Sequence, residues 1–290
     1  MYMLRRDRWL VVGLFTPGAL LFVLVILIPS VVSLRLSVME QSSLINEGTF
    51  VGLDNFVSLA GQEQFWRDLW NTTYYALVSV AIQIVLGVLF ALLLHRSFRG
   101  RNLARGLMLI PYVVPSIAVV IVWRWMLAPK LGIIDSWLRG LGFESYNAFS
   151  IEYAMATIIA ISVWTWTPFV VLVFLAALQT VPSELYESAS MDGATGWQQF
   201  WQITVPVLKP VIAMIVLLRG IFMFNKFDLV WLTTQGGPLR ATETLPILAY
   251  MDTFRLRNVG EGAAVAVVSL VLLLAVATIY FKLLKLDTEA

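Results

Sequence analysis

Four polar side chains interrupt an apolar stretch and are the residues of this chain best suited to bind a polar solute. They are Arg219, Asn225, Lys226 and Asp228. A charge at the centre of a membrane-spanning helix costs about 2.5–3.5 kcal/mol on insertion scales, so such a side chain faces protein or a water-filled cavity. On one continuous helix, Arg219 and Lys226 would share a face and lie about 10 Å apart along the axis. Two interpretations remain open: a structural ion pair between helices, and a polar lining for a translocation path.

A second group of candidate residues lies in the sequence Trp164-Thr165-Trp166, which Thr167 and Pro168 follow. Flat aromatic faces suit the C–H faces of sugar rings, and nearby hydroxyls can pair with sugar hydroxyls. A tightly packed helix kinked by the proline is the alternative interpretation. We predict that Trp164, Thr165 and Trp166 belong to the substrate path together with the four polar side chains.

The composition of the chain indicates an integral membrane protein. Hydrophobic residues make up 59% and charged residues 13%, whereas charged residues make up about 25% of a soluble domain. The 290 residues leave room for several spans of about 20 residues each. The chain has no cysteine and one histidine, which argues against a disulfide and against a zinc site. No G-x-x-x-x-G-K-S/T sequence is present, so we expect this chain not to bind nucleotide phosphates itself. From these absences together we expect no catalytic residue, no metal and no cofactor bound by this chain.

Long uncharged runs predict an all-α protein with six transmembrane helices in a single transmembrane domain, residues 1–290. The predicted spans are about 9–34, 70–94, 106–127, 153–179, 207–232 and 262–281. Pro111 and Pro115 predict a kink in the third span. With the N-terminus inside, the inner segments carry ten Lys and Arg residues against seven in the outer ones, which predicts that both termini lie in the cytoplasm.

The polar segment from Glu184 to Pro206 separates two apolar runs, and this topology places it inside the cell. Its sequence predicts two short helices. Ser183 is the expected N-cap of the first helix, and Gly193 should end that helix in a left-handed conformation. Thr195 with Gln198 predicts a capping box for the second helix. The proline that ends the segment should terminate this helix.

The spacing inside this segment resembles a known motif. Glu187-Ser188-Ala189 is followed by Gly193 after three residues and by Ile203-Thr204-Val205-Pro206 after nine more. This resembles the E-A-A, G, I-x-L-P loop of permease subunits in binding-protein-dependent ABC importers, with Ser188 and Val205 as conservative departures. The resemblance implies a coupling helix that docks on the ATP-hydrolysing subunit. The residues that it assigns to this loop are Glu187, Ser188, Ala189, Asp192, Gly193, Ala194, Ile203 and Pro206.

Residues 227–244 resemble the outer segment of carbohydrate-type permeases, in particular the first of the two permease subunits of maltose-type systems. Gly236-Gly237-Pro238 predicts a tight turn and is the candidate outer contact for a binding protein. Further matches to the same family are residues 50–56, Asn71-Thr72, Gly132-Ile133-Ile134-Asp135 and Gly262-Ala263-Ala264. The family more often has asparagine where this chain has Asp135. The outer loop at 35–68 is short, so contacts made by the large inserted domain of maltose permease do not transfer.

The resemblance implies a type I ABC importer permease in the cell (inner) membrane of a bacterium or archaeon. Such a subunit moves a sugar or oligosaccharide into the cytoplasm by alternating access. It implies as partners a second homologous permease subunit, two ATPase subunits that hold ATP and Mg, an extracytoplasmic solute-binding protein, the carbohydrate and membrane lipid, and no nucleic acid.

Two other functions remain open. The first is a glycerol-phosphate importer, because Arg219 and Lys226 suit a phosphate. The second is an ion-coupled secondary carrier, for which Asp228 is the only candidate acid. The carrier would leave the motif of residues 184–206 unexplained.

Overall fold

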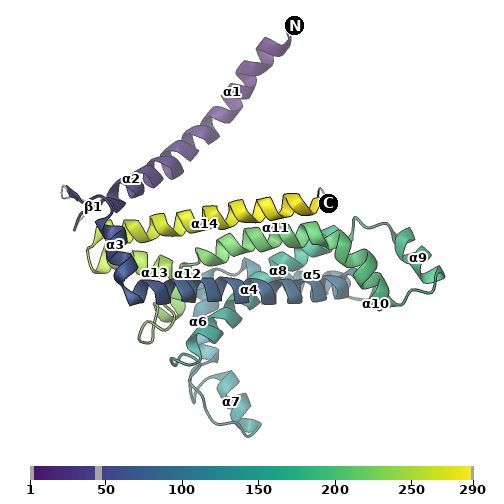
Figure 1. The fold of residues 1–290 in the computed structure, drawn as a ribbon. Coiled ribbons are helices and arrows are strands. Elements are labelled where there is room, and N and C mark those ends of the chain that lie inside the picture. The colour runs from purple at the N-terminus through teal and green to yellow at the C-terminus, as the bar shows by residue number, and fades with distance from the viewer. Residues whose placement is uncertain (1–2, 43–47, 289–290) are drawn as a thin grey trace. The chain divides into compact units, whose positions relative to one another are not determined.

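The computed structural model describes residues 3–42 and 48–288, and the described part of the chain is almost entirely helical (Figure 1). Five of its helices are long and apolar enough to cross a membrane, or six if one sharply bent pair counts as a single span. The predicted all-α membrane class is therefore confirmed. Contacts divide the chain into two compact units, Met1–Trp66 with Leu248–Val276 and Arg67–Ile247 with Ala277–Ala290.

The first unit contains the N-terminal span and a small hairpin. Its elements are α1 (Met3–Phe22), η1 (Val23–Leu27), α2 (Ile28–Ser37), β1 (Met39–Glu40), β2 (Thr49–Phe50), α3 (Asp54–Gly61), η3 (Met251–Arg255) and most of α14 (Val259–Thr288). The apolar helix Val12–Ser37 is the first candidate span. The strands pair antiparallel with Met39 opposite Phe50.

Two of the sequence segments that resemble the permease family lie in this unit, and packing explains a residue in each of them. Asn55 donates its side-chain amide to the carbonyl of Ser37 at 2.9 Å and to that of Met39 at 3.0 Å, which anchors α3 to the hairpin. In Gly262-Ala263-Ala264, a Cβ added to Gly262 would lie 2.1 Å from Oγ1 of Thr253, so only glycine fits at this point.

The second unit contains every candidate site residue. Its elements are most of α4 (Glu63–His95), α5 (Arg101–Val113), α6 (Ser116–Met126), α7 (Ile133–Gly140), α8 (Ala154–Leu178), α9 (Ser183–Met191), α10 (Gly196–Gln199), η2 (Phe200–Thr204), α11 (Val205–Phe224), α12 (Asp228–Thr234), the start of α13 (Leu245–Tyr250) and the end of α14.

A buried apolar cluster joins α4, α8 and α11. Its members are Ala91, Leu94, Val170, Val171, Phe174, Leu175, Leu178, Leu208 and Ile215. Gly87 lets α4 approach α8 closely, because a Cβ there would lie 2.5 Å from Cγ1 of Val170. These three helices therefore form the packed frame on which the site is built.

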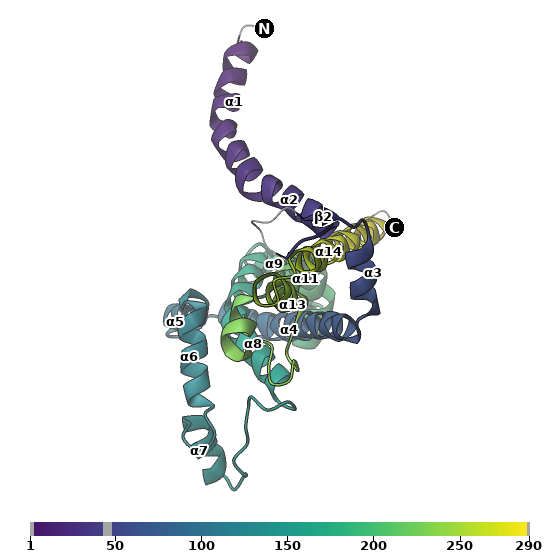
Figure 2. The same cartoon turned by 90° about the vertical axis from the view of Figure 1, so that its left-hand side faces the viewer.

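The third predicted span is broken. Instead of one kinked helix over about 106–127, α5 and α6 meet at an angle of 96°, and Figure 2 shows α6 turning away from α5, which is seen nearly end-on. Val114 has extended backbone, as expected before a proline, and Pro115 follows it as the N-cap of α6. The expected kink therefore lies at Pro115, and it is sharp enough to separate two helices.

The fifth apolar helix differs from the predicted span of about 207–232 at both ends. It runs without a break from Gly196 to Phe224 through α10, η2 and α11. Pro206 does not end it, and the expectation that it would was wrong. The π-helical turn η2 precedes the proline, and the N–H of Val205 bonds to the carbonyl of Phe200 five residues back. This wider turn accommodates a residue that has no N–H to donate.

Candidate functional site

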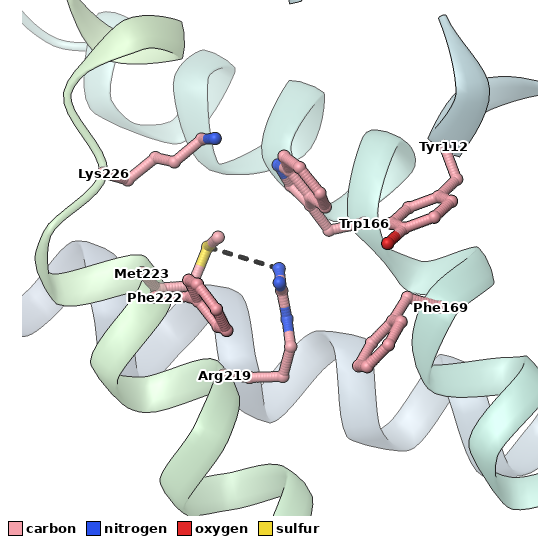
Figure 3. A pocket seen from close by; sticks show the side chains of 7 residues that line it. All are labelled: Tyr112, Trp166, Phe169, Arg219, Phe222, Met223 and Lys226. Atoms are coloured by element: carbon pink, nitrogen blue, oxygen red, sulfur yellow. Dashed lines mark hydrogen bonds between the residues drawn. The ribbon is translucent and has the colours of Figure 1, made fainter. Parts of the chain in front are cut away.

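A pocket of about 300 Å³ opens between α5, α8 and α11 in the second unit. In Figure 3 the aromatic side chains of α5 and α8 face the C-terminal part of α11 across the cavity. Its lining residues are Tyr112, Trp166, Phe169, Arg219, Phe222, Met223 and Lys226. The pocket is thus walled mainly by aromatic rings and contains two cationic side chains.

Arg219 is the central polar group of this pocket, and its side chain is buried with 4% exposure. Its Nε donates to Oε1 of Gln83 on α4 at 3.0 Å, and one terminal nitrogen lies 3.8 Å from the sulfur of Met223. The guanidinium carbon is 5.1 Å from the ring centroid of Trp166 and 6.0 Å from that of Phe169. The charge is therefore stabilised by a neutral amide and by aromatic faces.

Lys226 differs from Arg219 because it has an acidic partner. Its ammonium nitrogen lies 2.8 Å from Oδ1 of Asp228. The same nitrogen is 4.3 Å from the ring centroid of Trp166. No ion pair of this kind joins Arg219 to a carboxylate within residues 3–42 and 48–288. The pocket consequently carries one cation whose charge this part of the chain does not neutralise.

The structure brings together three of the seven predicted path residues, namely Trp166, Arg219 and Lys226. The other four do not line the pocket. Trp164 packs edge-on against Trp123 with centroids 5.6 Å apart, and Thr165 bonds to its own helix at Ile161. Residues two apart on a helix point to nearly opposite sides, which separates Trp164 from Trp166.

The two remaining predicted residues lie beyond the end of α11. Asn225 is exposed and bonds to its own helix at the carbonyl of Ile221, and Asp228 begins α12. Because the helix ends at Phe224, the argument that Arg219 and Lys226 share one helical face does not hold. The turn after α11 nevertheless returns Lys226 to the same pocket.

Sequence reasoning missed five residues that surround Arg219 or line the pocket: Gln83, Tyr112, Phe169, Phe222 and Met223. Gln83 carried a usable signal, because an amide in the middle of an uncharged run needs a partner inside the protein. The aromatic and methionine side chains carried none. An apolar residue facing a pocket and one facing lipid look the same in a sequence.

The loop at 184–206 contains a glycine-dependent turn after α9. Gly193 has φ of +80°, in the left-handed region, as predicted. The N–H of Ala194 bonds to the carbonyl of Ala189 at 2.9 Å, and the N–H of Gly193 bonds to that of Ser190 at 3.1 Å. This pair of bonds defines a Schellman motif, in which the left-handed residue closes the helix.

The second helix of the loop begins with the predicted capping box. The backbone N–H of Thr195 bonds to the side-chain oxygen of Gln198 at 2.7 Å, and the N–H of Gln198 bonds to Oγ1 of Thr195 at 3.4 Å. The predicted N-cap of the first helix is wrong. Ser183 is already helical, and the preceding Pro182 occupies the N-cap position without a side-chain bond.

Side chains tie the two helices of the loop to each other. Gln199 donates to the hydroxyl of Ser190 at 2.8 Å. The hydroxyls of Tyr186 and Thr204 lie 3.0 Å apart. The loop is therefore a cross-linked unit, in which α9 is bonded to the N-terminal part of the helix Gly196–Phe224.

The residues that the motif assigns to coupling are spread over this loop. Glu187 and Ser188 are exposed on α9, Ala189 is half-buried beside them, and Asp192 and Ala194 flank the glycine turn. Ile203 lies in η2 and Pro206 in α11. Several large apolar side chains are also exposed here, namely Leu185, Met191, Trp197 and Trp201.

The segment with Gly236-Gly237-Pro238 is held by bonds of its own. Gly236 has φ of +86°, and its carbonyl accepts the N–H of Thr242 at 3.1 Å. Oγ1 of Thr242 donates to the carbonyl of Gly237 at 2.8 Å. Leu239 at the tip is 81% exposed. The result is a fixed loop with one apolar side chain presented to its surroundings.

Asn71 and Thr72 of α4 anchor the far side of this loop. The amide of Asn71 donates to the carbonyl of Glu243 at 3.0 Å, and Thr72 accepts the N–H of Leu245 at 2.8 Å. Burial raises the pKa of the Glu243 carboxyl, and Arg240 at 3.5 Å partly opposes this shift. These contacts give a structural reason for the Asn-Thr pair that begins the apolar run of α4.

Asp135 organises the segment around α7. It accepts bonds from Ser145 at 2.6 Å, from Nε of Arg139 at 2.9 Å and from the backbone N–H of Lys130 at 3.0 Å. The bond from Ser145, with those from Arg139 and Lys130, lowers the pKa of this carboxyl although its burial acts in the opposite direction.

Comparison with known proteins identifies the family. The family described as "Binding-protein-dependent transport system inner membrane component" matches residues 83–287. The chain therefore belongs to this family of ABC transporter permease subunits and is a multi-pass protein of the inner membrane.

Its relatives are similar along nearly the whole length. A probable ABC transporter permease of Brucella suis biovar 1 is 34% identical over 96% of this chain and 97% of its own length. The trehalose/maltose transport system permease MalF of Thermococcus litoralis is 34% identical over 89% of this chain and 87% of its own. The sn-glycerol-3-phosphate permease UgpA of Agrobacterium fabrum is 30% identical over 94% and 93%.

Solved structures show the same fold. A chain of a bacterial ABC transporter that imports the acidic polysaccharide alginate matches with a TM-score of 0.78 at 22% identity, covering 97% of this chain and 98% of its own. The predicted ABC importer permease fold is thus confirmed.

Proposed function

We propose that this chain imports a carbohydrate that an extracytoplasmic solute-binding protein delivers, driven by ATP hydrolysis in separate partner subunits. The observation that carries the proposal is the continuous helix Gly196–Phe224. It begins in the loop of residues 184–206 and ends at the pocket, with Arg219 one turn before its end.

The helix supplies a direct mechanical link. From Gly196 to Arg219 it spans about 35 Å at 1.5 Å per residue. Figure 1 shows α9 and α10 at the opposite end of α11 from α12. A displacement of the cross-linked loop moves α11 relative to Trp166 and Phe169 on α8, and this movement changes the pocket. Alternating access requires such a coupling between a cytoplasmic event and the substrate cavity.

The partners follow from the surfaces at the two ends. The exposed side chains on α9 and α10 are suited to a cleft in an ATPase subunit. Two copies of that subunit, with ATP and Mg, would serve this chain and a second homologous permease. The loop with Gly236-Gly237-Pro238 is the proposed contact for the binding protein. A related alginate importer has been solved with its sugar-bound periplasmic protein, at a TM-score of 0.81 and 20% identity. No nucleotide or other cofactor is assigned to this chain.

The proposed topology places both termini and the 184–206 loop in the cytoplasm. Single cysteines test it cleanly because the chain has none. A cysteine at exposed Leu239 should react with an impermeant reagent added to intact cells, and one at exposed Ser188 should not. Labelling at Ser188 from outside would overturn the topology.

A carbohydrate is favoured by the names of two relatives, the trehalose/maltose permease and a sulfoquinovosyl glycerol permease at 33% identity. A glycerol phosphate is the second candidate, favoured by the cations of the pocket and by the relative that transports sn-glycerol 3-phosphate. Uptake of labelled neutral sugars such as maltose and trehalose, of acidic sugars and of glycerol 3-phosphate by the same cells separates the two.

The central test uses the complex purified through a tag on this chain and reconstituted in liposomes with its binding protein. Uptake of labelled carbohydrate should require ATP and the binding protein, and it should survive a protonophore. Uptake that proceeds without ATP and stops when the proton gradient is removed would show instead an ion-coupled carrier.

A further inference from the structure

We propose that the pocket selects an anionic saccharide, with an oxyanion of the sugar bound at Arg219. The acid group can be a carboxylate, a phosphate or a sulfonate, because all three present paired oxygens. This inference rests on the proposed import function and specifies its substrate class.

The charge balance of the pocket is the first argument. A cation removed from water needs a compensating charge or a set of strong hydrogen bonds. Lys226 has such a charge in Asp228 at 2.8 Å. Arg219 is more deeply buried, and within the described ranges its charge has no carboxylate partner. Adding one anion to this pocket would balance its charge.

The orientation of the guanidinium is the second argument. Gln83 holds Nε at 3.0 Å, and this bond fixes the plane of the group. A guanidinium has five N–H donors, and a thioether such as Met223 at 3.8 Å is only a weak acceptor. Figure 3 shows the terminal nitrogens of Arg219 directed into the space between Met223 and Trp166. An oxyanion can therefore accept two parallel bonds, the geometry that arginine provides and lysine does not.

The aromatic walls supply the saccharide part of the specificity. Trp166 and Phe169 already contact the guanidinium. Tyr112 and Phe222 are 40% and 57% exposed, and both line the cavity. A sugar ring that stacks on one of them can place an acid substituent at Arg219.

The test measures uptake of matched pairs by cells that express the whole transporter. The pairs are digalacturonate and galactobiose, glucose 6-phosphate and glucose, and sulfoquinovose and 6-deoxyglucose, so that each arm tests one kind of acid group. The parent should take up one anionic member at least tenfold faster than its neutral counterpart. Arg219→Gln should reduce that ratio about tenfold or more, since it removes a charged hydrogen-bond donor. Arg219→Lys should retain part of it.

The ratio distinguishes binding from a structural role. If Arg219 only supports the fold, Arg219→Gln lowers uptake of both members equally together with the yield of assembled complex, and the proposal fails. Arg257→Gln is the matched control, because it removes an exposed arginine outside the pocket and should leave the ratio unchanged.

The outcomes also separate this inference from the import function. One result is uptake that depends on ATP and the binding protein but favours a neutral sugar, with the same uptake ratio in Arg219→Gln as in the parent. This result keeps the import function and overturns the anionic specificity. If no saccharide of either kind is taken up, both are overturned.

Discussion

Replacing Gly193 tests the proposed coupling role of the loop of residues 184–206. A Cβ added at this position meets no heavy atom within 4 Å. The effect of Gly193→Ala therefore comes from the backbone alone, because φ is +80°. The left-handed conformation costs an L-residue with a Cβ about 1–2 kcal/mol. A β-branched residue is worse at this φ, and asparagine is tolerated best.

The expected magnitude is an increase of about 5–30-fold in the open population of the turn. Two bonds report on it directly, from Gly193 N–H to Ser190 and from Ala194 N–H to Ala189. Hydrogen exchange of these amides in the detergent-purified complex should accelerate by the same factor. Exchange should accelerate most in Gly193→Val, less in Gly193→Ala and least in Gly193→Asn.

The functional consequence should follow the same order. If the loop has the proposed coupling role, a looser turn will transmit less of the ATPase closure to α11. ATP hydrolysis stimulated by loaded binding protein should then fall, and fewer ATPase copies should remain after purification. Substrate binding by the binding protein should be unchanged.

Gly196→Ala is the matched control. Gly196 is the first residue of α10, has no positive φ, and has open space at its Cβ position. Alanine there should be neutral or stabilising by about 0.4–1 kcal/mol. The turn is not the transmitting element if Gly193→Val and Gly193→Asn show equal stimulation of ATP hydrolysis by loaded binding protein. The same holds if Gly196→Ala lowers this stimulation as much as Gly193→Ala does.

Three further predictions concern stability. Gly87→Ala should destabilise the complex by about 1–3 kcal/mol through overpacking, because the new methyl group would lie 2.5 Å from Cγ1 of Val170. Val170→Ala in the same chain should restore part of the melting temperature. If the two substitutions instead lower the melting temperature additively, the contact is contradicted. Thr72→Val should cost about 1–3 kcal/mol by leaving the N–H of Leu245 without an acceptor, whereas Thr73→Val should cost less because its hydroxyl bonds only to its own helix; equal melting temperatures would refute the anchor. Asp135→Asn should increase tryptic cleavage after Arg139 several-fold at neutral pH. Since the pKa of Asp135 is lowered on folding, its carboxylate contacts should persist throughout the neutral and weakly acidic range in which trypsin cleaves, and the parent should resist cleavage across that range. Protection of the asparagine variant equal to the parent's would contradict this role.

The sequence alone determined the membrane class and two local features of the loop of residues 184–206, the glycine turn and the capping box. The glycine turn and the capping box depend on bonds between residues at most five positions apart, such as those from Ala194 to Ala189 and from Thr195 to Gln198. Bonds of this range depend on neighbours in the chain, so residue type and spacing predict them. The same local reasoning failed at Pro206. The helix continues through this proline, because the π-helical turn before it accommodates a residue without an N–H.

Only the tertiary structure decided the composition of the pocket. The bond between Arg219 and Gln83 joins residues 136 positions apart, and the tie of Lys226 to the pocket depends on a turn after Phe224. The spans are apolar on nearly every side, so the sequence does not reveal which face of a helix meets lipid and which meets another helix. Trp164 and Trp166 belong to the same short sequence motif and look alike in the sequence. In the structure Trp164 packs against α6, whereas Trp166 packs against α5 and α11, and this packing gives them different roles.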